Sequence, residues 1–183
     1  MIVKNSSLVR LFVLPVVFLS ACSSVTAPGT RSPDAILDDD QIEYRANRDI
    51  KLSDPAFDGS HIVVVSHKGV VLLCGEVASE ALKEKAGDVV VKMELVKAVH
   101  NELEVGPVTS LATRTTDAWI TTKAKSKMIA HGGIDVGQIN VTTENGTVFL
   151  MGLIPRAQAD AAVEVAGTVS GVKKIVKVFE YTD

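Results

Sequence analysis

The chain has 183 residues, a formal net charge of −3, and a composition that is 46% hydrophobic and 22% charged. This slightly acidic balance lacks the surplus of lysine and arginine that marks nucleic-acid-binding domains, so no nucleic-acid partner is expected. Aromatic residues make up only 4% of the chain and include a single tryptophan, so an exposed position for that side chain would stand out.

Residues 1–21 are typical of an export signal. Two basic residues precede an apolar stretch over 11–19, which has about half of the roughly 20 residues that a membrane-spanning helix needs. The stretch ends in Leu19-Ser20-Ala21-Cys22, which resembles the lipobox of bacterial lipoproteins. That resemblance implies cleavage before Cys22 and attachment of acyl chains such as palmitate, which would anchor the mature chain without a transmembrane helix. The alternative is a signal peptide, or a buried hydrophobic start of the chain, with a chance cysteine.

Residues 22–40 are interpreted as a flexible, acylated linker between the lipid and the folded part. Ser, Thr, Pro, Gly and Asp dominate this segment, as is typical of a spacer. Ser23 follows the cysteine where lipoproteins of the inner membrane usually have aspartate, so the resemblance implies the outer membrane. The run Asp38-Asp39-Asp40 is interpreted as a solvated linker end and helix cap rather than a calcium site. About 140 residues then remain, enough for one ordinary domain or two small ones.

The remainder of the chain contains an internal repeat. The segments 62–75 and 139–152 match at six of fourteen positions, and their residue numbers differ by 77 throughout. Each segment holds two β-rich runs around a two-residue turn, and Asn145-Gly146 in the second is a strong signal for a type I′ hairpin. Cys74 lies in an apolar run of the first segment and is interpreted as a small buried hydrophobe. A duplicated structural unit is the simplest explanation.

Each repeat is predicted to be an α+β unit of the order helix, strand, strand, helix, strand. Alanine-rich segments after the hairpins favour helices, and β-branched runs follow them. The units are expected at 41–106 and 112–183, each with its helices packed on a small three-stranded sheet. The predicted elements are helix 41–52, hairpin 62–75, helix 79–86 and strand 97–105, then helix 117–130, hairpin 139–152, helix 155–166 and strand 172–181.

This arrangement resembles the BON domain. The resemblance is carried by the glycines that close the hairpins, Gly75 and Gly152, by the alanine-rich helix, and most specifically by residues 117–123 and 141–153. A lipobox followed by two such units resembles the dual-BON outer-membrane lipoproteins of the DolP type. The resemblance implies a non-enzymatic, lipid-anchored protein on the periplasmic face of the outer membrane, whose second unit binds anionic phospholipid. It also implies enrichment at division sites and support of envelope integrity and outer-membrane protein assembly.

The helix expected over 117–130 favours a lipid site on its own residues. At about 100° per residue, Ile120, Ala124 and Met128 share one face, which should pack on the sheet and leave Trp119 pointing outward. Burial of apolar surface is worth roughly 25 cal/mol per Å², so an indole left in water needs a reason, and a membrane interface supplies one because lysines there attract anionic lipid. The predicted phospholipid-binding residues are Trp119, Lys123, Ser126, Lys127, Ile129 and Ala130.

Two alternatives for Trp119 stay open. The ring could fold back as a staple at the helix start, or pack on the other unit. An exposed tryptophan beside a lysine also suits the hot spot of an adaptor that docks an outer-membrane assembly machinery component or another envelope factor. The corresponding helix of the first unit has Gln41 in the place of Trp119, so one lipid site per chain is expected.

The sequence contains no recognisable catalytic or metal-binding motif. Its four histidines form no i, i+4 pair with each other or with cysteine, and HExxH, CxxC, G-x-S-x-G and P-loop patterns are missing. We therefore expect no catalytic residues, no cofactor and no metal. The remaining alternative is a metal site in which His61, His67 and Cys74 meet around the first hairpin.

Overall fold

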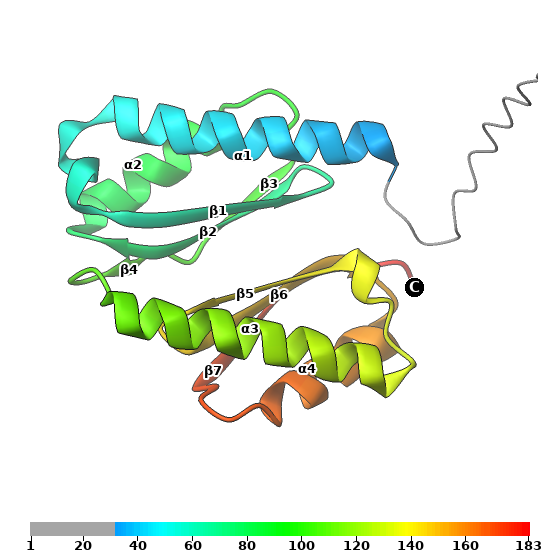
Figure 1. The fold of residues 1–183 in the computed structure, drawn as a ribbon. Coiled ribbons are helices and arrows are strands. Elements are labelled where there is room, and N and C mark those ends of the chain that lie inside the picture. The colour runs from blue at the N-terminus through cyan, green and yellow to red at the C-terminus, as the bar shows by residue number, and fades with distance from the viewer. Residues whose placement is uncertain (1–31) are drawn as a thin grey trace, which may run out of the picture.

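The structure is a computed structural model that describes residues 32–183, which form two α+β units of the same topology (Figure 1). The predicted signal 1–21 and the predicted acylation site Cys22 lie outside the described residues. The first unit comprises α1 (Pro33–Ser53), η1 (Pro55–Gly59), β1 (His61–His67), β2 (Val70–Val77), α2 (Glu80–Val91), β3 (Ala98–Asn101) and β4 (Glu104–Val105). The second comprises α3 (Leu111–His131), η2 (Val136–Gln138), β5 (Ile139–Glu144), β6 (Thr147–Ile154), α4 (Arg156–Gly167) and β7 (Lys174–Tyr181).

Helix α1 begins at Pro33, well before the predicted start at 41, so the predicted linker boundary at residue 40 is wrong. The Oγ of Ser32 caps the helix by accepting a hydrogen bond from the backbone N–H of Ala35 at 3.3 Å. Pro33 suits the first helical position, where a backbone N–H has no partner within the helix. Acidic residues such as Asp34 are favourable near this end because the helix dipole is positive there, which explains why a linker-like composition forms helix.

The two sheets have the same strand order, with the hairpin on one side and the closing strand on the other. β1 pairs antiparallel with β2, and β3 and β4 pair parallel with β2. β5, β6 and β7 repeat this arrangement. Both turn residues of each hairpin have positive φ, at 53° and 83° for Lys68 and Gly69 and at 49° and 77° for Asn145 and Gly146. This is the type I′ geometry that the sequence predicts.

Within each unit, two helices cover one face of the sheet. Ile120, Ala124 and Met128 of α3 are buried against the second sheet, as their spacing predicts. A Cβ added at Gly75 or Gly152 would lie 2.1 or 2.2 Å from the carbonyl oxygen of His61 or Gln138. These two glycines therefore let the hairpin strands approach each other at the point where each sheet begins.

The other faces of the two sheets pack against each other (Figure 1). Leu72 and Cys74 of β2 join Phe149 and Met151 of β6 in a third buried cluster. Cys74 is fully buried, and burial raises the pKa of its thiol, which confirms its interpretation as a small hydrophobe. This third cluster, between the two sheets, makes the two units one folded body.

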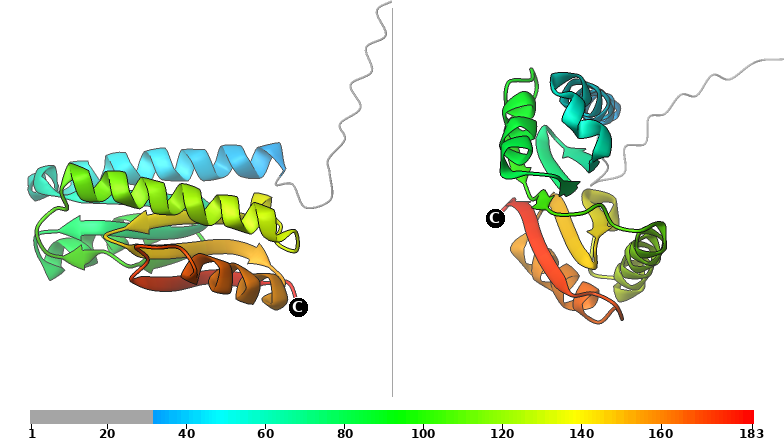
Figure 2. Two further views of the ribbon diagram at one scale, coloured as in Figure 1. Left: turned by 60° about the horizontal axis from the view of Figure 1, so that its bottom comes forward. Right: turned by 90° about the vertical axis from the view of Figure 1, so that its left-hand side faces the viewer.

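Helices α1 and α3 run antiparallel to each other and lie apart, with the edge strands β1 and β5 between them (Figure 1 and Figure 2). A groove of about 260 Å³ runs between them, with Asp40 and Glu43 of α1 on one wall and Lys125 of α3 on the other. The edge strands β1 and β5 form its floor. The pairing of the sheets thus makes the first helix of each unit one wall of a common groove.

Candidate functional site

Trp119 lies on the outer face of α3, with 53% of its surface exposed. The helix begins at Leu111, where Ser110 caps it, and ends at Gly132 in the left-handed conformation. Trp119 is therefore in the third turn rather than at the helix start, which excludes the staple alternative. Because about half of the surface of Trp119 is in solvent, the outward orientation predicted from helical periodicity is confirmed.

The other predicted site residues surround Trp119 but differ in availability. Lys123, Ser126 and Ala130 are exposed, and Ile129 presents 67% of its surface to solvent. Lys127 is half-buried, and its Nζ donates hydrogen bonds to the carbonyl oxygen and the Oγ1 of Thr168 at 3.0 and 2.8 Å. Lys127, which the sequence predicts as a phospholipid-binding residue, thus also ties α3 to the end of α4.

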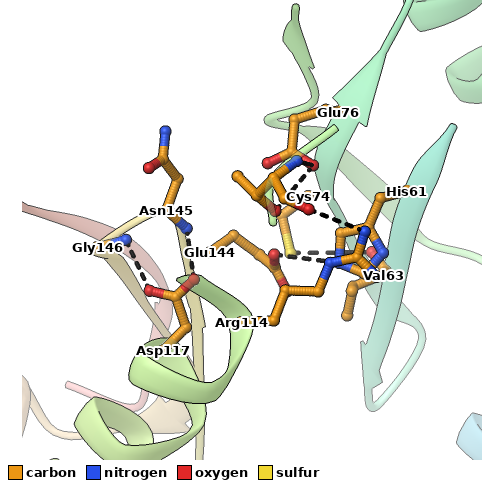
Figure 3. A network of polar contacts seen from close by, with 10 residues as sticks. His61, Val63, Cys74, Glu76, Arg114, Asp117, Glu144, Asn145 and Gly146 are labelled. Carbon is orange, nitrogen blue, oxygen red and sulfur yellow. Dashed lines mark hydrogen bonds and ion pairs between the residues drawn. The ribbon is translucent and has the colours of Figure 1, made fainter. Parts of the chain in front are cut away.

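Asp117 on the inner face of α3 holds that helix to the hairpin turn (Figure 3). Its carboxylate accepts hydrogen bonds from the backbone N–H groups of Asn145 at 3.0 Å and Gly146 at 2.9 Å. Because the carboxylate is buried and fixed to the sheet, the rotation of α3 about its axis is fixed too. Asp117 is therefore a positioning residue that directs Trp119 outward.

Asp39 repeats this arrangement in the first unit. Its carboxylate accepts hydrogen bonds from the backbone N–H groups of Lys68 at 2.8 Å and Gly69 at 3.0 Å, and from the Oγ of Ser66 at 2.7 Å. The interpretation of Asp38-Asp39-Asp40 as a solvated linker end is wrong for Asp39, which is buried. Sequence reasoning missed both aspartates, although an aspartate that precedes each type I′ turn by a similar distance, 29 and 28 residues, was a usable signal.

A polar cluster joins the two units near the start of α3 (Figure 3). The Nε2 of His61 lies 3.2 Å from the Oε2 of Glu144 across the interface. Burial raises the pKa of Glu144 to about 7, and the nearby carboxylates of Glu76 and Asp117 act in the same direction. Burial lowers the pKa of His61, and Arg114 adds to that shift. The contact therefore joins a neutral imidazole to a carboxyl group that titrates near neutrality.

The alternative of a metal site around the first hairpin is not supported within residues 32–183. His61, His67 and Cys74 do not form a metal-ligand set, since this part of the chain contains no group of three or more His, Cys, Asp or Glu side chains suited to a metal. Among the helices that the structure describes, none is both long and apolar enough to cross a bilayer.

The chain folds into two tandem α+β domains of the same topology. Each has a helix, a hairpin, a second helix and a closing parallel strand. The BON domain model matches residues 38–107 and 116–183. The chain is 36% identical to "Outer membrane lipoprotein DolP" of Haemophilus influenzae over 89% of this chain and 84% of that one. It is 37% identical to "21 kDa hemolysin" of Actinobacillus pleuropneumoniae over 84% of this chain and 76% of that one. The protein belongs to the BON domain family, as a dual-BON protein of the DolP type.

Among solved structures, the C-terminal domain of CdsD, a structural protein of the type III secretion system of Chlamydia trachomatis, covers 74% of this chain and 96% of its own. Its sequence identity of 13% and TM-score of 0.32 are too low to bear on function.

Proposed function

We propose that this protein is a non-enzymatic outer-membrane lipoprotein, anchored through acyl chains on Cys22, whose second BON domain binds anionic phospholipid through α3. The outer-membrane placement is supported by the resemblance to a lipobox and by the relative that is named an outer membrane lipoprotein. The lipid-binding role is supported above all by Trp119, an aromatic residue with about half of its surface in solvent near the middle of α3.

The composition of the outer face of α3 suits the headgroup layer of a bilayer. An indole ring and the exposed apolar side chain of Ile129 can enter the boundary between headgroups and acyl chains. Lys123 presents its ammonium group on the same face, and a cation near an anionic surface contributes about 1 kcal/mol. Lys127 contributes less to this attraction because Thr168 already binds its ammonium group.

The acyl anchor makes even a weak headgroup contact effective. An anchored domain samples the nearby bilayer at high local concentration, so the second contact determines orientation and lipid preference rather than attachment. We propose that this preference sorts the protein to anionic regions of the membrane, including division sites. There it would support envelope integrity and outer-membrane protein assembly.

Liposome flotation tests the lipid site with the mature chain carrying Cys22→Ser, which cannot be acylated. We expect flotation with vesicles of phosphatidylcholine and phosphatidylglycerol, and none with phosphatidylcholine alone. Trp119→Glu should abolish flotation, whereas Val91→Glu should not, because Val91 is similarly exposed but lies on α2 of the first BON domain and not on α3.

Equal flotation of the Trp119→Glu and parent chains would contradict the site. Failure of the parent chain to bind anionic vesicles would favour the alternative function, an adaptor that docks an envelope or assembly protein through the same exposed tryptophan.

A further inference from the structure

We propose that a hollow between α1 and α2 of the first BON domain binds the phosphate group of a small phosphate ester. The two helices pack side by side on the first sheet (Figure 1). The hollow has a volume of about 360 Å³, and its basic lining comes from Arg45 and Arg48 of α1 and from Lys92, the residue that follows α2. The lipid site proposed above lies on α3 of the second domain, so this inference goes beyond the proposed function and does not depend on it.

The second domain bridges the corresponding two helices. The helices of the two domains align residue by residue, because α1 and α3 each have 21 residues and start 78 residues apart. Likewise, α2 and α4 each have 12 residues and start 76 residues apart. In the second domain, the Nζ of Lys127 on α3 donates hydrogen bonds of 3.0 and 2.8 Å to Thr168, which directly follows α4. This lysine therefore spans the space between the helices.

The first domain has different side chains at the same two positions. Asp49 stands where the second domain has Lys127, and Lys92 stands where it has Thr168. The carboxylate of Asp49 contacts the guanidinium of Arg48 on its own helix at 2.8 Å. Asp49 and Lys92 both line the hollow. The lysine bridge of the second domain is thus replaced in the first by a hollow with cations on its two sides.

The donors around the hollow suit a phosphate group. Arg45 and Arg48 are exposed and lie three residues apart, so they are neighbours on the surface of α1. A guanidinium presents planar pairs of N–H donors that match phosphate oxygens, and an ammonium such as that of Lys92 adds a further charge-assisted hydrogen bond. The contact of Arg48 with Asp49 involves its Nε and Nη2 atoms, which leaves Nη1 for a ligand. An exposed ion pair of this kind is weak, so it does not hold the arginine against a better partner.

The charge and the size of the hollow favour a small anion that carries an organic group. Three cations and two carboxylates, those of Asp49 and Glu94, line it, so the lining has a net charge of +1 in a chain whose net charge is −3. Val89 and Met93, which pack against the core of the first domain, give it an apolar side. The volume lies within the range of about 300–1,000 Å³ that is typical of small-molecule sites, which is more than a bare phosphate ion needs.

An NMR titration of the backbone amide signals tests the site in the mature chain with Cys22→Ser. The probe is glycerol 3-phosphate, added at constant ionic strength so that a general effect of salt is excluded. We expect saturable shifts of the amides in residues 45–49 and 89–94. Inorganic phosphate should cause the same shifts with lower affinity, because it has no carbon chain to lie over the apolar side of the hollow. Tighter binding of inorganic phosphate would contradict an ester as the ligand.

Variants distinguish the site from a general attraction of anions. Arg45→Gln and Lys92→Gln each remove one cation at an exposed position and should weaken binding of glycerol 3-phosphate at least about fivefold. Lys177→Gln is the matched control, because it removes an exposed cation from β7 of the second domain, and it should bind like the parent chain. Equal affinities of the parent chain and the two hollow variants would overturn the site.

Micelles of a short-chain phosphatidylglycerol separate a soluble ester from a lipid headgroup. Shifts in residues 45–49 and 89–94 that occur with micelles and with neither soluble phosphate would assign the bound phosphate to a lipid. The absence of saturable shifts there with all three probes would overturn the proposal. The amides of 117–130 report on α3 in the same micelle titration, so a failure of the lipid site and a failure of the hollow are seen separately.

Discussion

The carboxylate of Asp117 and the backbone N–H of Gly146 are joined by a buried hydrogen bond of 2.9 Å. This bond ties the helix that carries Trp119 to the hairpin turn of its own sheet. The equivalent bond from Gly69 to Asp39 is 3.0 Å long, so the device occurs in both BON domains. The exposure of Trp119 thus depends on a residue on the opposite face of the helix.

Loss of the Asp117 carboxylate should destabilise the fold. Asp117→Ala leaves the N–H groups of Asn145 and Gly146 without their acceptor, and we expect a loss of about 2–4 kcal/mol in the free energy of unfolding. Urea denaturation measures this loss. Asp160→Ala, at an exposed position of α4, is the matched control and should change stability by less than about 0.5 kcal/mol. Equal stability of the two variants would contradict the positioning role.

Lys123 and Lys127 should contribute unequally to vesicle binding. Lys123→Gln removes a free exposed cation and should weaken binding to anionic vesicles about fivefold. Lys127→Gln should have a smaller effect on binding and instead lower the melting temperature, because it breaks the hydrogen bonds to Thr168. Flotation titrations and thermal melts separate the two effects. A larger loss of binding for Lys127→Gln would show that Thr168 does not hold its ammonium group in the bound state.

Glu144 should make stability depend on pH. Its pKa is about 7 in the folded protein against 4.5 as the ordinary value, so the folded state binds more protons between these pH values. Its contribution is therefore present at low pH and is lost as pH rises toward and through 7. His61, whose pKa is lowered, acts in the opposite direction, because the unfolded state takes up its proton first as pH falls.

Comparison with Glu144→Gln isolates the carboxyl group from the effect of His61. The variant should gain stability relative to the parent chain at pH 8, where the parent buries a carboxylate near Glu76 and Asp117. At pH 5 the gain should shrink or vanish. Thermal melts of both chains at the two pH values measure this. A difference that is the same at pH 5 and pH 8 would contradict a raised pKa.

The closing glycines of the hairpins should not tolerate a side chain. Gly152→Ala would place a Cβ 2.2 Å from the carbonyl oxygen of Gln138, and we expect a loss of about 3 kcal/mol or more, or failure to fold. Gly59→Ala is the control, because its Cβ would meet nothing within 4 Å. Expression yield and urea denaturation distinguish the two variants, and similar stabilities would show that the strands can separate at this point.

Local patterns predicted the elements that depend on near neighbours in the chain. The turn at Asn145-Gly146 followed from two residues that accept positive φ, and the buried face of α3 followed from the spacing of Ile120, Ala124 and Met128. The start of α1 was missed because residues 33–40 have the composition of a linker. They form helix because Ser32 caps them and because the carboxylate of Asp39 accepts a hydrogen bond from Gly69, in a turn almost thirty residues further along the chain.

By itself, the sequence determined the duplicated helix, hairpin, helix and strand order and the outward position of Trp119, since both depend on periodicities within single elements. The tertiary structure alone decided that the two sheets meet face to face through Leu72, Cys74, Phe149 and Met151. Contacts between distant segments leave no periodic signal, so neither this interface nor the groove between α1 and α3 could be predicted from the sequence.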